Sequence, residues 1–152
     1  LRDVYKRQEA MSAMLGHCLC GAVTVSVAAH RGFTAVCHCR MCQRWTGGLF
    51  ICVPVDAEGM QVEGPVERFA SSGFAERAFC STCGSHLWFR DLGGDGHYAM
   101  MPGLFDESRD WPLKSEIYTD RALPGLALPG DHRRNTRAEY EAKNAHVEGD
   151  LP

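Results

Sequence analysis

Short runs of alternating hydrophobic and polar residues occur along most of the chain. Residues 22–27 read Ala-Val-Thr-Val-Ser-Val, so three valines share one face of an extended segment. This alternation predicts a strand with its valines turned inward. Residues 49–55 also alternate and predict a second strand. Within it, Pro54 favours an edge position or a strand end, because proline has no N–H to donate to a neighbouring strand.

Further β-like runs are shorter, and glycine and proline turns separate them. They lie at residues 61–62, 66–70, 77–79, 86–89, 98–101 and 116–118. Many short strands at this spacing favour a mainly β fold. Helical patterns are weak before Thr136, where Thr136 and Glu139 have the spacing of a capping box and predict a short polar helix. We therefore expect few helices and no long one.

The two ends of the chain differ from its middle. Residues 1–13 begin without Met and carry charged residues in no regular pattern, so we interpret them as a non-native or disordered leader. Residues 129–152 are polar, and we expect a solvated, partly disordered tail apart from the short helix. One folded domain is expected between them, over residues 14–128.

The composition narrows the classes of function. Hydrophobic residues make up 45% of the 152 residues and charged residues 23%, as in an ordinary globular protein. The formal net charge is -3 and no block of Lys and Arg is present, so a nucleic-acid partner is disfavoured. Residues 10–29 carry no charge, but their alternation, His17 and two glycines differ from a signal peptide or membrane span. We expect no targeting segment and no membrane association.

Seven of the eight cysteines fall into three tight clusters. The clusters are Cys18-Leu19-Cys20, Cys37-His38-Cys39-Arg40-Met41-Cys42 and Cys80-Ser81-Thr82-Cys83. Thiols so close in sequence cannot join distant parts of a chain as disulfides, so metal binding is favoured. Four thiols plus three match one closed and one open zinc site, which predicts two Zn²⁺ per chain. Metal-bound thiolates must be protected from oxidation, so we expect the reducing cytoplasm.

Each cluster suggests a different use. In Cys80-x-x-Cys83-Gly84 the glycine permits the left-handed backbone of a tight metal-binding turn, and Cys18 and Cys20 are a candidate second pair. Cys37, Cys39 and Cys42 would then leave one zinc position free for water or for an incoming thiol. An alternative is that His38, His86 or Cys52 completes two closed structural sites.

Three spaced motifs resemble the glutathione-dependent formaldehyde-activating enzyme family, which shares its domain with centromere protein V. They are Gly16-x-Cys18-x-Cys20-Gly21-Ala22-Val23, Cys37-His38-Cys39-x-x-Cys42 followed by Thr46-Gly47, and Phe79-Cys80-x-x-Cys83-Gly84-Ser85-x-Leu87. The resemblance extends over roughly residues 15–118. It implies a β-tent fold of small antiparallel sheets clamped by a structural zinc.

The resemblance also implies roles for the cysteines. A structural zinc would bind Cys18, Cys20, Cys80 and Cys83, and a catalytic zinc would bind Cys37, Cys39 and Cys42. The implied activity is that of a carbon–sulfur lyase that joins formaldehyde to the thiol of glutathione and gives S-hydroxymethylglutathione. The expected partners are therefore a small thiol, such as glutathione, and an aldehyde. A non-catalytic zinc-binding interaction module, or an enzyme of the same fold that uses another small thiol, are the alternatives.

Other residues near the three-cysteine motif have less definite roles. Those that follow it directly are candidates for the substrate pocket: Gln43, Arg44, Trp45 and Thr46. For Arg44 a solvated position, and for Trp45 a packing role, are the simpler expectations. His38 is expected to be either an acid/base group or a residue that supports the ligands. Cys52 is expected to be a small buried hydrophobic residue, or else to face the open zinc.

Overall fold

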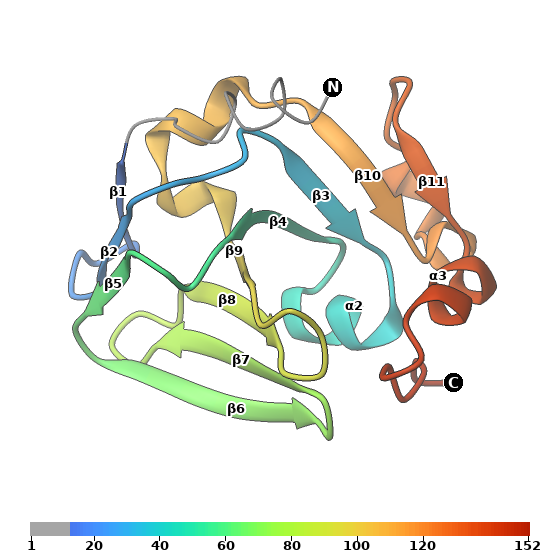
Figure 1. Ribbon diagram of the computed structural model, residues 1–152, viewed down its shortest axis with the longest axis horizontal. Helices are drawn as coiled ribbons and strands as arrows, with labels where there is room; N and C mark the ends of the chain where they lie inside the picture. Colours follow the sequence, from blue (N-terminus) through green and yellow to red (C-terminus); the bar gives the residue numbers. More distant parts are fainter. Residues whose placement is uncertain (1–12) are drawn as a thin grey trace.

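Two β-sheets form the framework of the structure, a computed structural model that describes residues 13–152 (Figure 1). Within these residues, eleven strands are accompanied by two α-helices of seven residues each. The predicted mainly β fold without a long helix is confirmed. All but the last residue of the leader predicted over residues 1–13 lies outside the described residues. None of the helices in the described range is long and apolar enough to span a membrane.

The smaller sheet has three antiparallel strands in the order β1 (Met14–His17), β2 (Thr24–Val27) and β5 (Met60–Glu63). Val25 and Val27 of β2 are buried, as is Val23 just before it, so the inward orientation predicted for these valines is confirmed. Alternation was informative here because this sheet covers the core with only one of its faces.

The larger sheet has eight strands in the order β11-β10-β3-β4-β9-β8-β7-β6 (Figure 1). In chain order they are β3 (Thr34–Cys37), β4 (Phe50–Val55), β6 (Val66–Ser72), β7 (Ala75–Cys80), β8 (His86–Asp91), β9 (Tyr98–Met100), β10 (Leu113–Ile117) and β11 (Arg133–Asn135). The pairing is antiparallel except at β10, which runs parallel to both of its neighbours. Residues 50–52 of β4 pair with β3 and residues 53–55 pair with β9. Pro54 therefore has a strand partner on one side only, which agrees with its predicted edge-like position.

The two α-helices differ in how well the sequence predicted them. α3 (Arg137–Lys143) begins with the predicted capping box, in which the Thr136 hydroxyl accepts from the Glu139 amide and the Glu139 carboxylate accepts from the Thr136 amide. α2 (Arg40–Thr46) was not predicted. Its N-cap is Cys39, whose sulfur accepts from the amide of Cys42 at 3.4 Å in place of the usual Ser, Thr, Asp or Asn. Four short 3₁₀ helices complete the structure, at Pro102–Leu104, Asp106–Asp110, Thr119–Arg121 and Pro124–Leu126.

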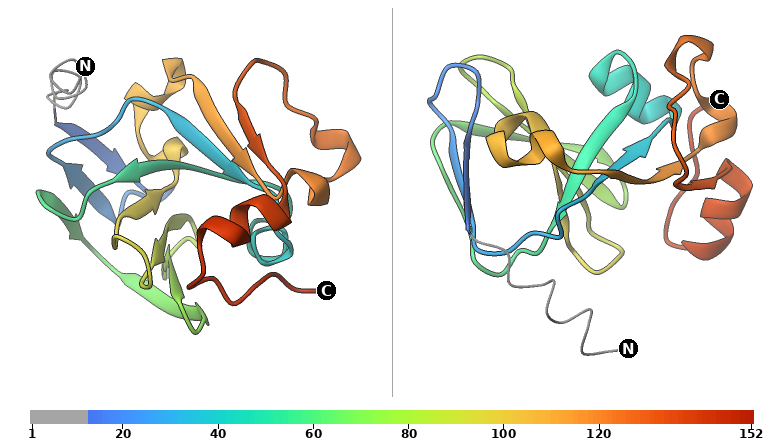
Figure 2. Two further views of the ribbon diagram at one scale, coloured as in Figure 1. Left: turned by 45° about the vertical axis from the view of Figure 1, so that its right-hand side comes forward. Right: turned by 90° about the horizontal axis from the view of Figure 1, so that it is seen from above.

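Residues 129–152 contain the expected short helix, but the expectation that the rest of this range is a solvated, partly disordered tail differs from the structure. Residues 133–135 form β11 and pair with β10, and the chain then runs through α3 to the side of α2 (Figures 1 and 2). Near the end of the chain, the carboxylate of Asp150 accepts hydrogen bonds from the amides of Arg40 and Met41. Polar residues here meet partners inside the protein, which their polarity alone did not reveal.

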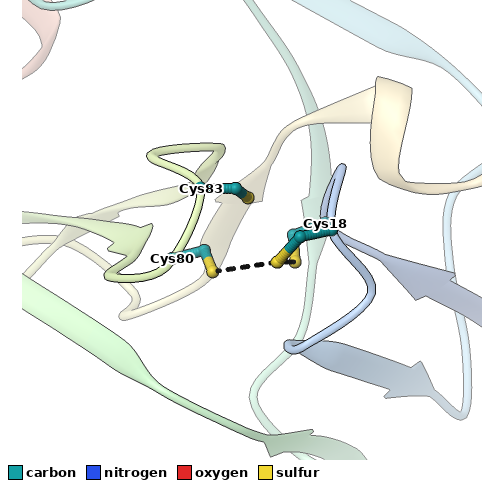
Figure 3. Close-up of side chains that lie close together, drawn as sticks. Cys18, Cys80 and Cys83 are labelled. Carbon is teal, nitrogen blue, oxygen red and sulfur yellow. Dashed lines mark hydrogen bonds between the residues drawn. The ribbon is translucent and has the colours of Figure 1, made fainter.

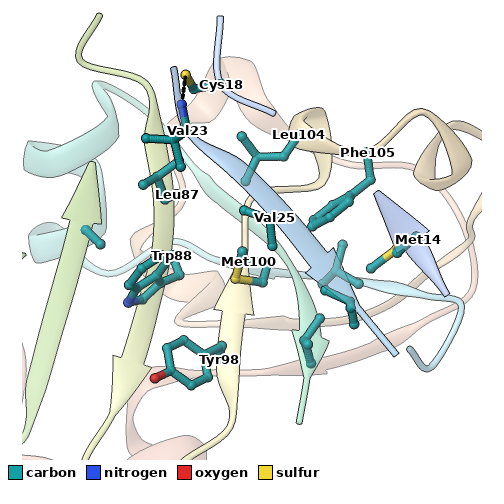
Figure 4. Packing of buried hydrophobic residues seen from close by; sticks show 14 of the residues in the cluster. Met14, Cys18, Val23, Val25, Leu87, Trp88, Tyr98, Met100, Leu104 and Phe105 are labelled. Carbon is teal, nitrogen blue, oxygen red and sulfur yellow. Dashed lines mark hydrogen bonds between the residues drawn. The ribbon is translucent and has the colours of Figure 1, made fainter. Parts of the chain in front are cut away.

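The main hydrophobic core lies between the two sheets (Figure 4). Its largest fully buried side chains are Trp88, Phe105, Met14, Leu87 and Met100. Gly16 allows a close approach at its edge, because a Cβ on Gly16 would lie 2.6 Å from the carbonyl oxygen of Leu104. A second cluster packs around Cys39 and Cys42 and includes Phe50, Ala99 and Tyr118. The second set of cysteines is therefore built into a hydrophobic region rather than placed on an exposed loop.

Candidate metal centres and the adjoining cavity

Four cysteines meet where the two sheets approach each other (Figure 3). Cys18 and Cys20 lie in the loop between β1 and β2. Cys80 is the last residue of β7, and Cys83 lies in the turn between β7 and β8. Their sulfur atoms are all within 4.8 Å of one another. The Sγ atoms of Cys18 and Cys20 are 3.5 Å apart, and those of Cys20 and Cys80 are 3.9 Å apart. We call these four residues the four-cysteine cluster.

Tight turns shape both halves of the four-cysteine cluster. Gly21 and Gly84 each have a φ of +77°, which is left-handed backbone that glycine adopts without strain. The amide of Gly21 donates to the carbonyl of Cys18 at 3.0 Å, and the amide of Gly84 donates to that of Cys80 at 2.8 Å. The left-handed conformation predicted at Gly84 is confirmed.

A second group, the three-cysteine cluster, contains Cys37, Cys39 and Cys42. Cys37 ends β3, Cys39 caps α2 and Cys42 lies in its first turn, so six consecutive residues bring three sulfurs together. Backbone amides donate to two of these sulfurs, from Cys39 to Cys37 at 3.5 Å and from Cys42 to Cys39 at 3.4 Å. Among the described residues, no fourth His, Cys, Asp or Glu joins this group within 4.8 Å.

The donor sets of both clusters fit a soft divalent metal ion. Tetrahedral zinc with Zn–S bonds of about 2.3 Å places its sulfurs about 3.8 Å apart. In the four-cysteine cluster the separations of 3.5 and 3.9 Å lie on either side of that value, and in the three-cysteine cluster all sulfurs lie within 4.8 Å of one another. All eight cysteines are free, so no disulfide competes for these sulfurs. Both clusters could hold a metal, one with four sulfurs and one with three.

A buried arginine lies against the three-cysteine cluster. Arg77 of β7 is only 2% exposed, and its Nη2 donates to the Sγ of Cys42 at 3.5 Å. The guanidinium carbon lies 4.9 Å from the ring centre of Phe89 and 5.8 Å from that of Phe50. Its Nη1 is buried without a hydrogen-bond partner in the described structure. Hydrogen bonds from Cys37 and Cys39, and then the charge of Arg77, hold the pKa of Cys42 well below its usual value.

The three-cysteine cluster opens into a cavity of about 250 Å³. Its walls are mainly apolar and include Val36, Met41, Phe50, Phe74, Phe89, Ala99, Ile117 and Val147. Polar groups enter it from Arg77, Arg133, Tyr118 and Tyr140. Cys52 also lines the cavity, and burial, followed by the negative charge of Cys42, raises its pKa to about 12. Cys52 thus lies on the cavity side of β4 without joining the three-cysteine cluster.

The pocket residues proposed from sequence, Gln43 to Thr46, do not line this cavity. Gln43 instead donates to the carbonyl oxygens of His38 and Arg121, and the Thr46 hydroxyl donates to that of Cys42. Arg44 is exposed, and Trp45 packs near Phe69, Phe79 and His86. A helix turns its residues through about 100° at each step, so the neighbours of Cys42 in sequence face other directions.

His38 lies between two cysteines in sequence but points away from their sulfurs. It is 1% exposed, and its Nε2 lies 2.7 Å from the carboxylate of Glu116 on β10. The other carboxylate oxygen of Glu116 contacts His132 and accepts from the Nε of Arg134 at 3.1 Å. Of the two roles predicted for His38, the geometry agrees with the supporting one, because its contact with Glu116 ties the segment of the three cysteines to β10.

Sequence reasoning missed several residues that line the cavity. Arg77, Tyr140 and Arg133 come from three separate elements and Tyr118 directly follows β10, so their proximity depends on the tertiary structure. Tyr118 has a φ of +56°, a left-handed conformation for a non-glycine residue, and its hydroxyl donates to Glu141 at 3.1 Å. Burial, followed by the charge of Cys37, raises the pKa of Tyr140 to about 12. Only the unusual Tyr118 backbone is a local feature, and its sequence gave no sign of it.

Comparison with known proteins adds to this geometry. Residues 13–121 match the model of the family described as glutathione-dependent formaldehyde-activating enzyme. An uncharacterized lyase of Schizosaccharomyces pombe is 33% identical over 106 residues, which are 69% of this chain and 77% of that protein. A crystal structure of a Rhodobacter sphaeroides protein is similar with a TM-score of 0.55 at 22% identity, and the match covers 66% of this chain and all of the other. The structural likeness concerns the fold alone.

Proposed function

Because this chain belongs to the glutathione-dependent formaldehyde-activating enzyme family, we propose that it is a carbon–sulfur lyase that makes and breaks adducts of a small thiol with an aldehyde. The adduct of glutathione with formaldehyde, S-hydroxymethylglutathione, is the first candidate. The observation that carries the proposal is the three-cysteine cluster, which has no fourth donor among the described residues and opens into a cavity. A metal site with only a structural role would need neither an incomplete set of donors nor an adjoining cavity.

We assign a zinc ion to each cluster. Cys18, Cys20, Cys80 and Cys83 would saturate a tetrahedral ion, which suits a structural site joining the two sheets. Cys37, Cys39 and Cys42 would leave one position for a ligand, which suits a catalytic site. A zinc ion bound there supplies the positive charge that favours the thiolate form of a substrate thiol at neutral pH.

The protein's own residues would provide charge balance and exclude water. Three thiolates on a divalent cation carry a net charge of -1, and Arg77 beside Cys42 offsets it. A further thiolate can therefore approach without entering a strongly negative site. The phenylalanine rings around Arg77 keep this region apolar, which strengthens electrostatic interactions within it.

The proposed reaction is an addition. The thiolate sulfur forms a bond to the carbonyl carbon, the π electrons of the C=O bond move to oxygen, and the resulting alkoxide takes a proton from solvent. The reverse reaction breaks the C–S bond and returns the aldehyde. Addition of this kind proceeds without a catalyst, so the protein's main contribution would be to orient the two reactants. Thiolate chemistry requires a reducing environment, and we place the protein in the cytoplasm.

Zinc counting combined with kinetics tests this proposal. Native mass spectrometry should find two zinc ions in the parent chain and one in Cys42→Ser. The control Cys52→Ser, which alters a cavity cysteine outside the three-cysteine cluster, should keep two. NMR exchange measurements with glutathione and ¹³C-formaldehyde should show faster adduct formation with the parent chain than without protein, and no acceleration with Cys42→Ser.

Two outcomes would contradict the proposal. The first is a parent chain that binds two ions but does not accelerate adduct formation with glutathione or another small thiol. That result would favour a non-catalytic zinc-binding module. The second is a Cys42→Ser variant that retains both ions and full acceleration, because the three-cysteine cluster would then not be the site of reaction.

A further inference from the structure

Part of the cavity wall comes from outside the region that matches the family. The family match ends at residue 121, whereas Arg133, Tyr140 and Val147 line the cavity of the three-cysteine cluster. We call residues 131–152 the C-terminal segment. It supplies these three side chains from β11, from α3 and from the end of the turn that follows α3. The shape of the cavity therefore depends on residues that the family match does not include.

Several buried or partly buried contacts hold the C-terminal segment in place. At its start, His132 and Arg134 bind the carboxylate of Glu116 on β10. At its end, Asp150 has a fully buried side chain that accepts from the amides of Arg40 and Met41 and forms an ion pair with Arg121 at 3.0 Å. The segment is thus fastened to β10 on one side and to α2, which carries Cys42, on the other. Its cavity residues are held at fixed positions relative to the three-cysteine cluster.

Two adjacent arginines of β11 have different environments. Arg134 pairs with Glu116 and also donates to two backbone carbonyl oxygens. Arg133 lines the cavity, is exposed to solvent, and has no ion-pair or hydrogen-bond partner among its side-chain contacts in residues 13–152. Successive side chains of a strand point to opposite faces, which explains the contrast. Arg133 is therefore a positive charge available to a ligand in the cavity.

Other charged groups of the cavity form no ion pair with Arg133 among residues 13–152. The acidic group that lines the cavity, Asp91, is paired with His146 at 2.6 Å. His97 is paired with Asp95. The second arginine, Arg77, lies deeper and contacts Cys42. The cavity thus has one cation beside the sulfurs and another on the wall formed by the C-terminal segment, an arrangement that suits a ligand with a thiol and a separate anionic group.

We propose that Arg133 determines substrate specificity by binding a carboxylate of a thiol substrate whose sulfur approaches the three-cysteine cluster. This inference rests on the proposed function for the position of the sulfur. The guanidinium group presents two parallel N–H donors that match the two oxygens of a carboxylate. A thiol without a carboxylate gains nothing from this contact. The specificity of the chain thus resides in a segment beyond the family match.

Binding measurements on the zinc-loaded full chain test the proposal without requiring turnover. Isothermal titration calorimetry would compare glutathione with its diethyl ester, in which both carboxylates are blocked, for the parent chain, Arg133→Gln and Arg109→Gln. Arg109 is a matched control, because its side chain is 77% exposed and lies outside the cavity. Loss of one charged hydrogen-bonding contact should weaken glutathione binding to Arg133→Gln about tenfold. Diester binding should be the same in all three proteins.

The results separate this inference from the proposed function. Weaker glutathione binding in Arg133→Gln alone, with diester binding unchanged, supports the role of Arg133 even if no adduct formation is accelerated. In that case the proposed function fails and the carboxylate site stands. A parent chain that does not bind glutathione, or an Arg133→Gln variant that binds both ligands as the parent does, overturns the inference. Equal losses for the two ligands overturn it as well, since the carboxylates would then not be what Arg133 recognises.

Discussion

Replacement of Arg77 by methionine should weaken metal binding at the three-cysteine cluster and leave the four-cysteine cluster unchanged. Methionine keeps an unbranched apolar chain against Phe50 and Phe89 but removes the charge beside Cys42. At the observed 3.5 Å and an effective dielectric constant of 20, the attraction between opposite unit charges is about 5 kcal/mol. This is an upper limit, because burying the guanidinium group has a cost that the methionine avoids.

A smaller figure follows from measured hydrogen bonds to charged groups, which contribute about 1.5–3 kcal/mol. That range corresponds to roughly a tenfold to hundredfold loss of affinity. Competition with a chromophoric chelator would measure the affinity of each of the two ions separately. Arg90→Met is the matched control, since Arg90 is a partly buried arginine of β8 that packs on Tyr98 and does not line the cavity.

The reasoning would be refuted if Arg77→Met bound both ions as tightly as the parent chain. It would also be refuted if Arg90→Met lost as much affinity as Arg77→Met, because a general loosening of the sheet would then explain both results. Selective loss at one cluster is therefore the decisive result.

Two other predictions concern stability. Burial would raise the pKa of Glu116, but hydrogen bonds from His132 and His38 outweigh this effect and lower its pKa below the ordinary value of 4.5. The contribution of the ionised Glu116 to folding stability is therefore fully present above pH 4.5 and is lost as the pH falls through the lower pKa of the folded state. Glu116→Gln should cost about 2 kcal/mol at pH 7, and urea unfolding at pH 7 and pH 3.5 should show the difference from the parent shrinking in acid; a constant difference would contradict this account. Cys80→Ser, or removal of metal by a strong chelator, should cost several kcal/mol because the four-cysteine cluster links the two sheets, whereas Cys42→Ser should melt within a few degrees of the parent. Melting would be monitored by circular dichroism. Equal melting temperatures for the two cysteine variants would show that the four-cysteine cluster does not stabilise the fold more than the three-cysteine cluster does.

Local sequence patterns predicted the features that depend on local physics. The valines of β2 alternate because one face of the small sheet is buried, and the Thr136 capping box depends on residues three positions apart. The three-cysteine cluster followed in the same way, because a strand end and one short helix bring its members together, and a tight turn forms each cysteine pair of the four-cysteine cluster. The pairing of Cys18 and Cys20 with Cys80 and Cys83 needed a resemblance to a known family, since spacing alone cannot choose between clusters.

Features that depend on distant partners were not predictable in this way. β11 reads Arg-Arg-Asn, which has no apolar face, and it forms because β10 supplies both a strand edge and the carboxylate of Glu116. α2 lacks a usual N-cap, and Cys39 takes that role. In the sequence Arg77 does not differ from an arginine on the surface of a short strand, and only the fold buries it against Cys42. The contribution of the C-terminal segment to the cavity could not be predicted for the same reason.

The chain separations within the two cysteine clusters also set an order of assembly. Cys39 and Cys42 are three residues apart, whereas Cys20 and Cys80 are separated by 60. Closing the longer loop costs about 3 kcal/mol more in chain entropy. During synthesis, Cys37, Cys39 and Cys42 are joined to the chain before Cys80 and Cys83, so the three-cysteine cluster is complete in the nascent sequence first. Under the proposed function, an ion in the four-cysteine cluster can be fully bound only once residues 18–20 and 80–83 have come together, so loading of this cluster is tied to the meeting of the two sheets.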